Sequence, residues 1–249
     1  MGRNFNSQSY RSFNLQHMIA VITGGSRGIG FAIARQFFLE GYSVLTCSRN
    51  QKQLDEAAKL FKAMGGSGSF EYLVADLSDK NENKRFAEWI LAKGSPGVLV
   101  NNAGTYLPGD CLTETDGTLE KLMEVNLYSA YHLTRSLLPS MKKNDSGHIF
   151  NICSIASLKA YPGGGAYSIS KFALHGFTLN LRREVMPDKI KVTGVYPGAV
   201  LTDSWAGFDN SQNRIMEPED IATMVLAASK LSAGACVEEI LIRPLAGDL

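Results

Sequence analysis

Short apolar runs and longer amphipathic segments alternate along this chain. The runs consist mostly of consecutive Val, Ile and Leu residues, not of apolar and polar residues in strict alternation. This is the pattern of strands that are covered on both faces of a sheet. The runs predict seven strands, at residues 19–23, 43–47, 70–74, 98–100, 148–152, 191–195 and 238–242.

Between these runs, apolar residues recur at helical spacing. The predicted helices cover residues 30–40, 51–64, 82–93, 119–143, 167–186 and 218–231. The last one has a typical start, because Pro218 is followed by Glu219 and Asp220. Strands and helices that alternate in this way predict an α/β fold, with a doubly wound, mostly parallel seven-stranded sheet and helices on both faces.

We expect a single domain over residues 18–249, because no linker, repeat or low-complexity segment interrupts the pattern. Residues 1–17 are polar, and Asn, Ser, Gln and Arg dominate them. They contain no signal-peptide core, so we interpret them as a disordered or appended tail outside the fold.

Composition and charge narrow the classes of partner. The 249 residues are 45% hydrophobic and carry a formal net charge of +1, so no basic surface calls for nucleic acid or an anionic membrane. No apolar run approaches the roughly 20 residues that span a bilayer. The four cysteines are scattered, without metal-ligand spacing. We therefore expect no nucleic acid, membrane or metal partner, and a cytoplasmic protein with reduced thiols.

A glycine-rich loop follows the first predicted strand. Residues 23–30 read TGGSRGIG, and a predicted helix comes next. Glycine lets the backbone turn sharply and approach a pyrophosphate without a Cβ clash, and a helix N-terminus offers free N–H groups to the anion. An ordinary turn is the alternative, but the strand before the loop and the helix after it favour a dinucleotide-binding loop.

The end of the second strand bears on the choice between the two nicotinamide cofactors. Residues 47–50 read CSRN and lack the Asp or Glu that usually bonds the ribose 2′-hydroxyl of NAD. Arg49 and Arg27 can instead pair with a 2′-phosphate. The alternative is that both arginines are solvated surface residues. The two arginines and the missing acid together favour NADPH over NADH.

Tyr167 and Lys171 lie four residues apart in a predicted helix and therefore share a face. A tyrosine pKa of about 10 is too high for efficient acid–base work near neutrality, but a lysine ammonium and an oxidised nicotinamide would lower it. Such a pair also arises by chance, so its surroundings matter. Ser154 and residues 101–104 (NNAG) each follow a predicted strand, at the edge where open α/β sheets bind ligands.

Together with Asp76, Asn126 and the Pro197-Gly198 pair, these motifs resemble the short-chain dehydrogenase/reductase family in order and spacing, over nearly all of residues 18–249. The resemblance implies a single-domain Rossmann-type fold and a catalytic tetrad of Asn126, Ser154, Tyr167 and Lys171. It also implies that Asp76 contacts the adenine, Asn101 shapes the pocket beside the cofactor, and Thr202 holds the carboxamide side of the nicotinamide. The expected contacts to NADP(H) are Thr23, Gly24, Ser26, Arg27, Gly28, Ile29, Gly30, Ser48, Arg49, Asp76, Leu77, Asn102, Ala103, Gly104, Tyr167, Lys171, Pro197, Gly198, Val200 and Thr202.

The C-terminal half is similar to bacterial sepiapterin-reductase-type members of this family, for example at residues 146–150, 197–200 and 218–222 and in the ending 237–248. That ending departs from the Asp-Gly-Gly finish of 3-oxoacyl-carrier-protein reductases, and residues 47–50 are also similar to NADPH-using tropinone reductases. The resemblance implies an NADPH-dependent carbonyl reductase or alcohol dehydrogenase that acts on a small ketone. A reductase of 3-oxoacyl thioesters and a non-catalytic NADP(H)-sensing protein are the alternatives, and the retained tyrosine and lysine argue against the sensor.

The expected substrate contacts are Ser154, Tyr161, Tyr167 and Trp205. Trp205 and Phe208 fall in a flap expected over residues 202–217, where they either stack on a planar substrate or serve in packing or subunit contacts. The glycines at 163–165 predict a loop that bends readily. By the same resemblance, the helices at 119–143 and 167–186 form a subunit interface, so we expect a homodimer or homotetramer.

Overall fold

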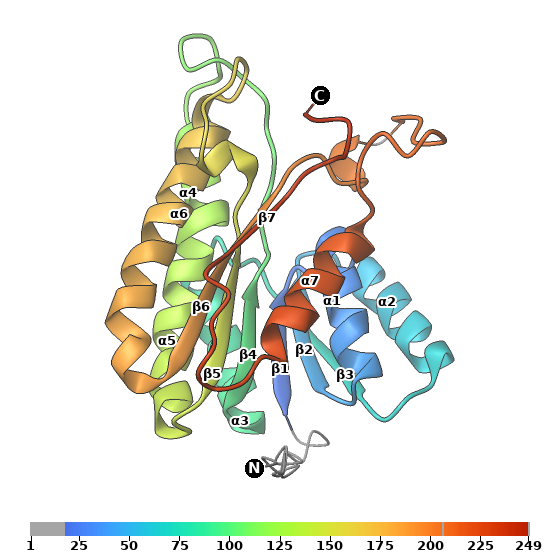
Figure 1. Cartoon of the computed structure of the whole chain (residues 1–249), viewed down its shortest axis with the longest axis vertical. Coiled ribbons are helices and arrows are strands. Elements are labelled where there is room, and N and C mark those ends of the chain that lie inside the picture. Colours follow the sequence, from blue (N-terminus) through green and yellow to red (C-terminus); the bar gives the residue numbers. More distant parts are fainter. Residues whose placement is uncertain (1–17, 206, 249) are drawn as a thin grey trace, which may run out of the picture.

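The computed structural model describes residues 18–205 and 207–248, so the predicted tail at residues 1–17 lies outside the described residues. Its centre is a seven-stranded sheet in the order β3-β2-β1-β4-β5-β6-β7 (Figure 1). All neighbouring strands pair in parallel, which confirms the predicted doubly wound sheet. The strands are β1 (Ile19–Thr23), β2 (Ser43–Ser48), β3 (Ser69–Val74), β4 (Pro96–Asn101), β5 (Gly147–Ile152), β6 (Ile190–Pro197) and β7 (Glu239–Ile242).

Helices cover both faces of the sheet (Figure 1). They are α1 (Gly28–Leu39), α2 (Gln51–Met64), α3 (Lys80–Lys93), α4 (Thr118–Met123), α5 (Ser129–Lys143), α6 (Gly165–Val185) and α7 (Pro218–Ser229). The helices α1, α2 and α7 pack on one face, and α3, α5 and α6 pack on the other. Short turns of helix, η2 (Glu124–Tyr128), η3 (Ile155–Ser157), η4 (Met186–Asp188) and η5 (Asp203–Trp205), complete the structure.

The first strand shows why the apolar runs are continuous. All residues of β1 are buried. Ala20 and Ile22 belong to the core cluster that contains Phe37 of α1. Val21, which points to the opposite face, belongs to the cluster that contains Leu133 of α5. Because side chains alternate between two covered faces, every position of such a strand is apolar.

The structure divides the helix expected over residues 119–143. A π-helical turn, η2, separates α4 from α5 and contains the buried Asn126. The backbone stays in the right-handed helical region through Glu124 and Ser129, so the path is continuous although the hydrogen-bond pattern changes. Turns of this kind insert an extra residue and frequently occur at functional sites.

The strand order reverses between β1 and β4, which are neighbours in the sheet but are not consecutive in the chain. Open α/β sheets bind ligands in the crevice outside the carboxyl ends of the strands at such a point. None of the helices among the described residues is both long enough and apolar enough to span a lipid bilayer. The same residues contain no group of three or more His, Cys, Asp or Glu side chains placed to hold a metal ion.

Candidate active site

The loops after β1 and β4 are locked together by hydrogen bonds. The Oγ1 atom of Thr23 accepts hydrogen bonds from the backbone N–H groups of Asn102 (2.9 Å) and Ala103 (2.8 Å). In return, Nδ2 of Asn102 donates to the carbonyl of Thr23 at 2.8 Å. The structure therefore brings the glycine-rich loop and residues 101–104 to one edge of the sheet.

The glycines of the first loop are required by its backbone. Gly24 (φ +68°) and Gly28 (φ +56°) lie in the left-handed region, which a side chain strongly disfavours. A Cβ atom on Gly30 would lie 2.4 Å from the carbonyl oxygen of Gly24. The residue that caps α1, Arg27, makes no side-chain capping bond, so this helix presents its first N–H groups to the crevice as an anion site.

The arginines expected to bind a 2′-phosphate each have a carboxylate partner. Arg27 forms an ion pair with Asp203 of η5, and Nη1 of Arg49 lies 3.7 Å from Oδ2 of Asp76. Both arginine side chains are more exposed than buried, at 57% and 61%. Exposed ion pairs contribute about 0–1 kcal/mol to stability. A phosphate group with two negative charges can therefore take the place of either carboxylate as the partner of the arginine.

The other expected cofactor contacts lie next to Arg49 and Asp76 or in the glycine-rich loop. Ser48 ends β2, and its hydroxyl accepts a hydrogen bond from the backbone N–H of Asn50 at 3.4 Å. Leu77, which follows Asp76, is buried. Ser26 and Ile29 are half-buried in the glycine-rich loop and the first turn of α1.

Tyr167 and Lys171 occupy the same side of α6, and Nζ of Lys171 lies 5.9 Å from the centre of the Tyr167 ring. The ammonium group also donates to the carbonyl of Ile152, the last residue of β5, at 2.9 Å. Ser154 caps η3 directly after that strand, with its Oγ accepting from the N–H of Ala156 at 3.1 Å. The predicted tyrosine, lysine and serine therefore lie together at the carboxyl end of β5.

Asn126 joins this cluster from the π-helical turn. Its Nδ2 donates to the carbonyl of Thr105 (3.1 Å) and to Oγ of Ser170 (2.9 Å), and its Oδ1 accepts from the N–H of Thr105 (2.8 Å). A Cβ atom on Gly104 would lie 3.1 Å from Oδ1 of Asn126 and 3.6 Å from Nζ of Lys171. The loop after β4 thus fits between the asparagine and the lysine, and the four predicted tetrad residues form one group.

Burial has the largest effect on the pKa values of Tyr167 and Lys171. Burial raises the pKa of Tyr167 to about 12; a hydrogen bond from Ser154 opposes this, and Tyr106 and Cys153 raise the pKa further. Burial also lowers the pKa of Lys171. Burial thus penalises the phenolate and the ammonium alike, and the lowering of the tyrosine pKa expected from Lys171 and an oxidised nicotinamide stays a prediction.

Asn101 takes a different position from the one expected. Its side chain is buried, and Nδ2 donates to Oγ1 of Thr134 in α5 (2.9 Å) and to Oδ1 of Asn151 in β5 (2.8 Å). The Nδ2 atom of Asn151 donates in turn to Oγ1 of Thr178 in α6 at 2.9 Å. Asn101 thus connects the sheet to the two helices that carry or adjoin the tetrad, and its side chain faces the core.

The segment after β6 forms a flap over the glycine-rich loop. The N–H of Gly198 donates to the carbonyl of Ile242 at 2.8 Å, which fixes the turn after Pro197. Val200 is buried and pairs with Met216 at the other end of the flap. A Cβ atom on Gly28 would lie 3.3 Å from Cγ2 of Thr202, so the expected nicotinamide-side threonine sits directly against the loop.

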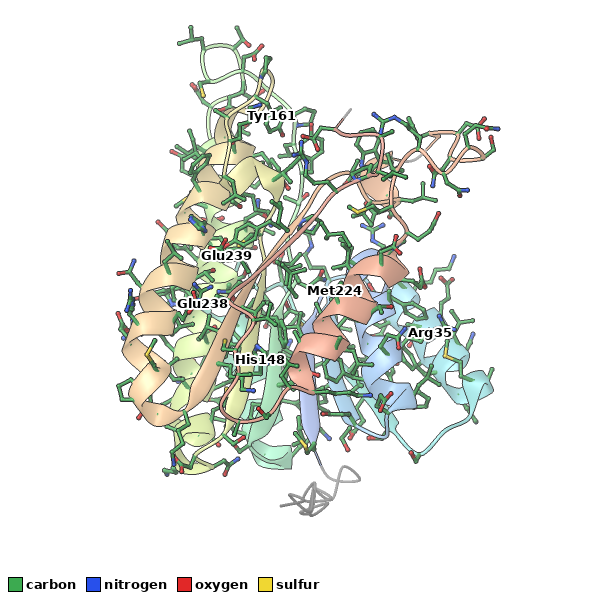
Figure 2. All side chains as sticks on the ribbon, in the orientation of Figure 1. Arg35, His148, Tyr161, Met224, Glu238 and Glu239 are labelled. Atoms are coloured by element: carbon green, nitrogen blue, oxygen red, sulfur yellow. The ribbon has the colours of Figure 1, made fainter. Side chains whose placement is uncertain are left out.

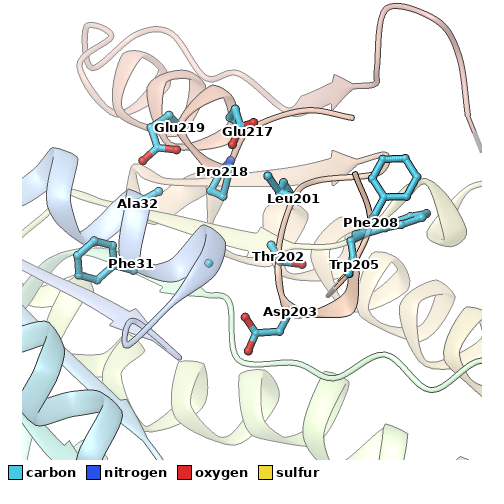
Figure 3. A pocket seen from close by; sticks show the side chains of 12 residues that line it. Phe31, Ala32, Leu201, Thr202, Asp203, Trp205, Phe208, Glu217, Pro218 and Glu219 are labelled. Atoms are coloured by element: carbon cyan, nitrogen blue, oxygen red, sulfur yellow. The ribbon is translucent and has the colours of Figure 1, made fainter. Parts of the chain in front are cut away.

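A cavity of about 480 Å³ lies between the flap and the starts of α1 and α7 (Figure 3). Its lining includes Phe31, Thr202, Trp205, Phe208 and Glu217. The rings of Trp205 and Phe208 meet edge to face, with centroids 5.4 Å apart. The two aromatic residues named for substrate stacking are therefore packed against each other in the flap.

Sequence reasoning missed the loop between β4 and α4 as a partner of the tetrad. The ring of Tyr106 packs edge to face on that of Tyr167, with centroids 4.8 Å apart. Tyr106 lies two residues after the NNAG motif, at the carboxyl end of a strand, which is a signal that was available. Glu114 accepts a hydrogen bond from the N–H of Ala166 at 3.2 Å, and its place in the sequence gave no such signal.

The glycines at 163–165 are explained by this loop. Gly163 accepts from the N–H of Gly109 at 3.0 Å, and a Cβ atom on Gly165 would lie 2.4 Å from the carbonyl oxygen of Gly109. At the loop that was expected to bend readily, the glycines thus allow two backbone segments to approach each other closely. Tyr161, just before these glycines, lies beyond the N-terminal end of α6, far along the molecule from His148 (Figure 2).

Comparisons with known proteins identify the family of the chain. A sequence model described as short chain dehydrogenase matches residues 18–213. A sepiapterin reductase of Chlorobaculum tepidum is 34% identical over 241 residues, which cover 93% of this chain and 98% of that protein. An uncharacterized oxidoreductase of Staphylococcus saprophyticus is 32% identical over 93% of this chain and 99% of its own length.

Solved structures of similar fold are also related in sequence. A metagenomic short-chain oxidoreductase in complex with NADP has a TM-score of 0.81 and 34% identity, and covers 92% of this chain and 98% of its own. An L-sorbose reductase from Gluconobacter frateurii, complexed with NADPH and L-sorbose, has a TM-score of 0.84 and 26% identity, with coverage of 92% and 96%.

Proposed function

This chain belongs to the short-chain dehydrogenase family of oxidoreductases, and we propose that it is an NADPH-dependent carbonyl reductase acting on a small ketone, or on the corresponding alcohol in reverse. The observation that carries the proposal is the meeting of Asn126, Ser154, Tyr167 and Lys171 at the carboxyl ends of β4 and β5. This group lies beside the point where the strand order reverses.

The residues of the crevice fit a dinucleotide with a 2′-phosphate. The left-handed Gly24 and Gly28 allow close approach of the backbone, and the N-terminus of α1 suits the pyrophosphate. Arg27 and Arg49 supply exposed positive charge where an NAD enzyme usually has an acid. Relatives of known structure hold NADP or NADPH, which supports this choice. When bound, the cofactor supplies the hydride.

In the proposed reduction, the hydroxyl group of Tyr167 donates a proton to the oxygen of the substrate carbonyl as negative charge develops there. A tyrosine with a pKa of about 12 is fully protonated near neutrality, which is the form that donation requires. Ser154 donates a hydrogen bond to the same oxygen and stabilises its charge. Lys171 lies beside the phenol ring and would bind the ribose of the nicotinamide, and Asn126 would hold a water molecule through which protons reach Lys171.

For the substrate, we propose a small ketone of the kind reduced by sepiapterin reductases. The support is the relative from Chlorobaculum tepidum, together with the exposed ring of Tyr161 and with Trp205, which lines the cavity under the flap. Oxidation of NADPH should accompany reduction of sepiapterin or diacetyl, and should be faster than with acetoacetyl thioesters. If thioesters are the better substrates, the acyl-thioester alternative holds. If no carbonyl compound is reduced although NADPH binds, the protein is a sensor.

We also propose that the protein forms a homodimer or homotetramer through α5 and α6. Large apolar side chains on these helices and on η2 are exposed: Tyr128, Tyr131, Ile169, Phe172 and Leu179. A surface of this kind on a folded chain usually marks an interface. The four cysteines are all free, which supports the further proposal of a reducing, cytoplasmic location.

A further inference from the structure

Two tyrosines flank the proposed proton donor on the side opposite the flap. Tyr106 comes from the loop after β4, and its ring meets that of Tyr167 at 85°, with centroids 4.8 Å apart. Tyr161 comes from the segment before α6. Burial raises the pKa of Tyr161, and the nearby hydroxyl of Tyr106 raises it further. Both phenols therefore lie close to the tetrad, and Tyr106 is in direct ring contact with Tyr167.

The loop that carries Tyr106 is held in place near its far end. The N–H of Gly163 donates to Oδ1 of Asp110 at 3.0 Å, and the N–H of Gly109 donates to the carbonyl of Gly163 at 3.0 Å. Glu114 accepts from the N–H of Ala166, directly before Tyr167. These bonds join the loop to the start of α6, so the segment that carries Tyr106 is tied to the helix that carries Tyr167.

Both flanking rings remain open to a ligand. Tyr106 is 38% exposed and Tyr161 is 39% exposed, although Tyr106 packs against Tyr167. An edge-to-face contact occupies only part of a ring, so the rest of the Tyr106 surface is free to meet a substrate. A molecule with a flat aromatic ring gains from such a side chain through stacking, whereas a small aliphatic ketone has no ring to stack.

We propose that Tyr106, supported by Tyr161, is a specificity-determining residue that selects carbonyl compounds bearing a flat aromatic ring and orients them against Tyr167. This inference rests on the proposed carbonyl reductase function and refines its substrate class. It assigns the selection to the loop after β4, on the other side of the tetrad from Trp205, which is already packed against Phe208.

The test compares two vicinal diketones that share the reacting group and differ in a phenyl ring: 1-phenylpropane-1,2-dione and diacetyl. The variants are Tyr106→Leu, which keeps bulk but removes the ring, and Tyr106→Phe, which keeps the ring. Tyr72→Phe, at a tyrosine that bonds Asp55 on the far edge of the sheet, is the matched control for loss of a phenol hydroxyl. Steady-state NADPH oxidation gives KM and kcat. Calorimetric titration of each diketone into the protein with NADP+ gives binding without turnover.

In Tyr106→Leu we expect KM and Kd for the phenyl compound to rise about three- to tenfold, with diacetyl changed by less than about twofold, since an aromatic contact is worth this much. Tyr106→Phe and Tyr72→Phe should keep the preference of the unaltered protein for the phenyl compound. Equal changes for both diketones, or no change for either, would overturn the inference. If neither diketone is reduced but binding of the phenyl compound still depends on the Tyr106 ring, the proposed function fails and the binding inference stands.

Discussion

A single hydroxyl group, that of Tyr167, carries the proposed proton transfer. Replacing Tyr167 with Phe removes the donor but leaves the ring, which packs against Tyr106. We expect kcat for carbonyl reduction to fall at least about 100-fold, the usual contribution of a general acid. The Kd for NADPH, measured by fluorescence titration, should stay close to that of the unaltered protein. A Tyr167→Phe variant with normal turnover would show that another group donates the proton.

Arg27 and Arg49 decide the proposed preference for NADPH. Each already lies beside a carboxylate, Asp203 or Asp76, and their large exposure makes both pairs weak. Changing both arginines to Ala should weaken NADPH binding about 100-fold or more, because two charge-assisted contacts to phosphate are lost, and leave NADH binding nearly unchanged. Parallel titrations with the two cofactors measure the difference. If the affinity for both falls equally, the arginines do not read the 2′-phosphate.

We expect His148, which lies in β5 far along the molecule from Tyr161 (Figure 2), to make the stability of the protein depend on pH. It is buried, stacks on Phe150 with ring centroids 3.9 Å apart, and contacts Oγ1 of Thr193 through Nε2 at 2.7 Å. Burial lowers its pKa from 6.5 to about 3. Between these two pH values, the unfolded chain therefore binds a proton at His148 and the folded protein does not. The contribution of neutral His148 to the free energy of unfolding is complete above pH 6.5 and is lost as the pH falls toward 3.

The consequence is a free energy of unfolding that declines by up to a few kcal/mol between these pH values, as measured by urea denaturation. His148→Gln keeps a polar side chain near Thr193 but does not titrate, so part of this decline should disappear. An identical pH dependence in the variant would assign the acid sensitivity to other groups.

At the level of elements, helix α6 depends on a distant cap. Gly164 precedes it and makes no side-chain capping bond, and Glu114 bonds the N–H of Ala166 from the loop after β4. Glu114→Ala should lower the free energy of unfolding by about 1 kcal/mol, the usual value of a lost cap, and should lower kcat because Tyr167 follows the capped residue. Glu114→Gln keeps an acceptor oxygen and should recover most of both losses.

Thermal unfolding and steady-state turnover, measured on both variants, check this prediction. Asp209→Ala, at an exposed flap residue whose carboxylate accepts a hydrogen bond from the N–H of Ser211, is a control for loss of a surface carboxylate. If Glu114→Ala loses stability while kcat is unchanged, the loop stabilises the helix without positioning the tyrosine.

The elements themselves were largely predictable. The first strand and α2 have the predicted bounds, because the apolar pattern is local and both faces of the sheet are covered. The π-helical turn around Asn126 was not predictable, since one extra residue in a turn leaves helical spacing almost unchanged. The Glu114–Ala166 bond was equally hidden, because the two residues lie 52 positions apart and only the fold brings them together.

Across the whole molecule, motif and strand order together predicted where the tetrad assembles, but not how its groups titrate. Tyr167 and Lys171 were placed correctly on one side of a helix at the sheet edge. Burial raises the pKa of Tyr167 and lowers that of Lys171, and Tyr106 from the loop after β4 raises the pKa of Tyr167 further. The spacing of residues along the chain does not show how deeply they are buried, so these pKa shifts could not be predicted from the sequence.

The outer surface of α5 and α6 gives a prediction about assembly. Phe172 in α6 is 42% exposed and lies among the apolar side chains proposed to form the subunit interface. Phe172→Glu places a charge there, which would have to be desolvated on association, so the variant should have a smaller mass by light scattering than the unaltered protein. Leu60→Glu, at a 53% exposed position on α2 across the sheet, should leave the mass unchanged. An unaltered protein that is already monomeric, or a Phe172→Glu variant of undiminished mass, would rule out this interface.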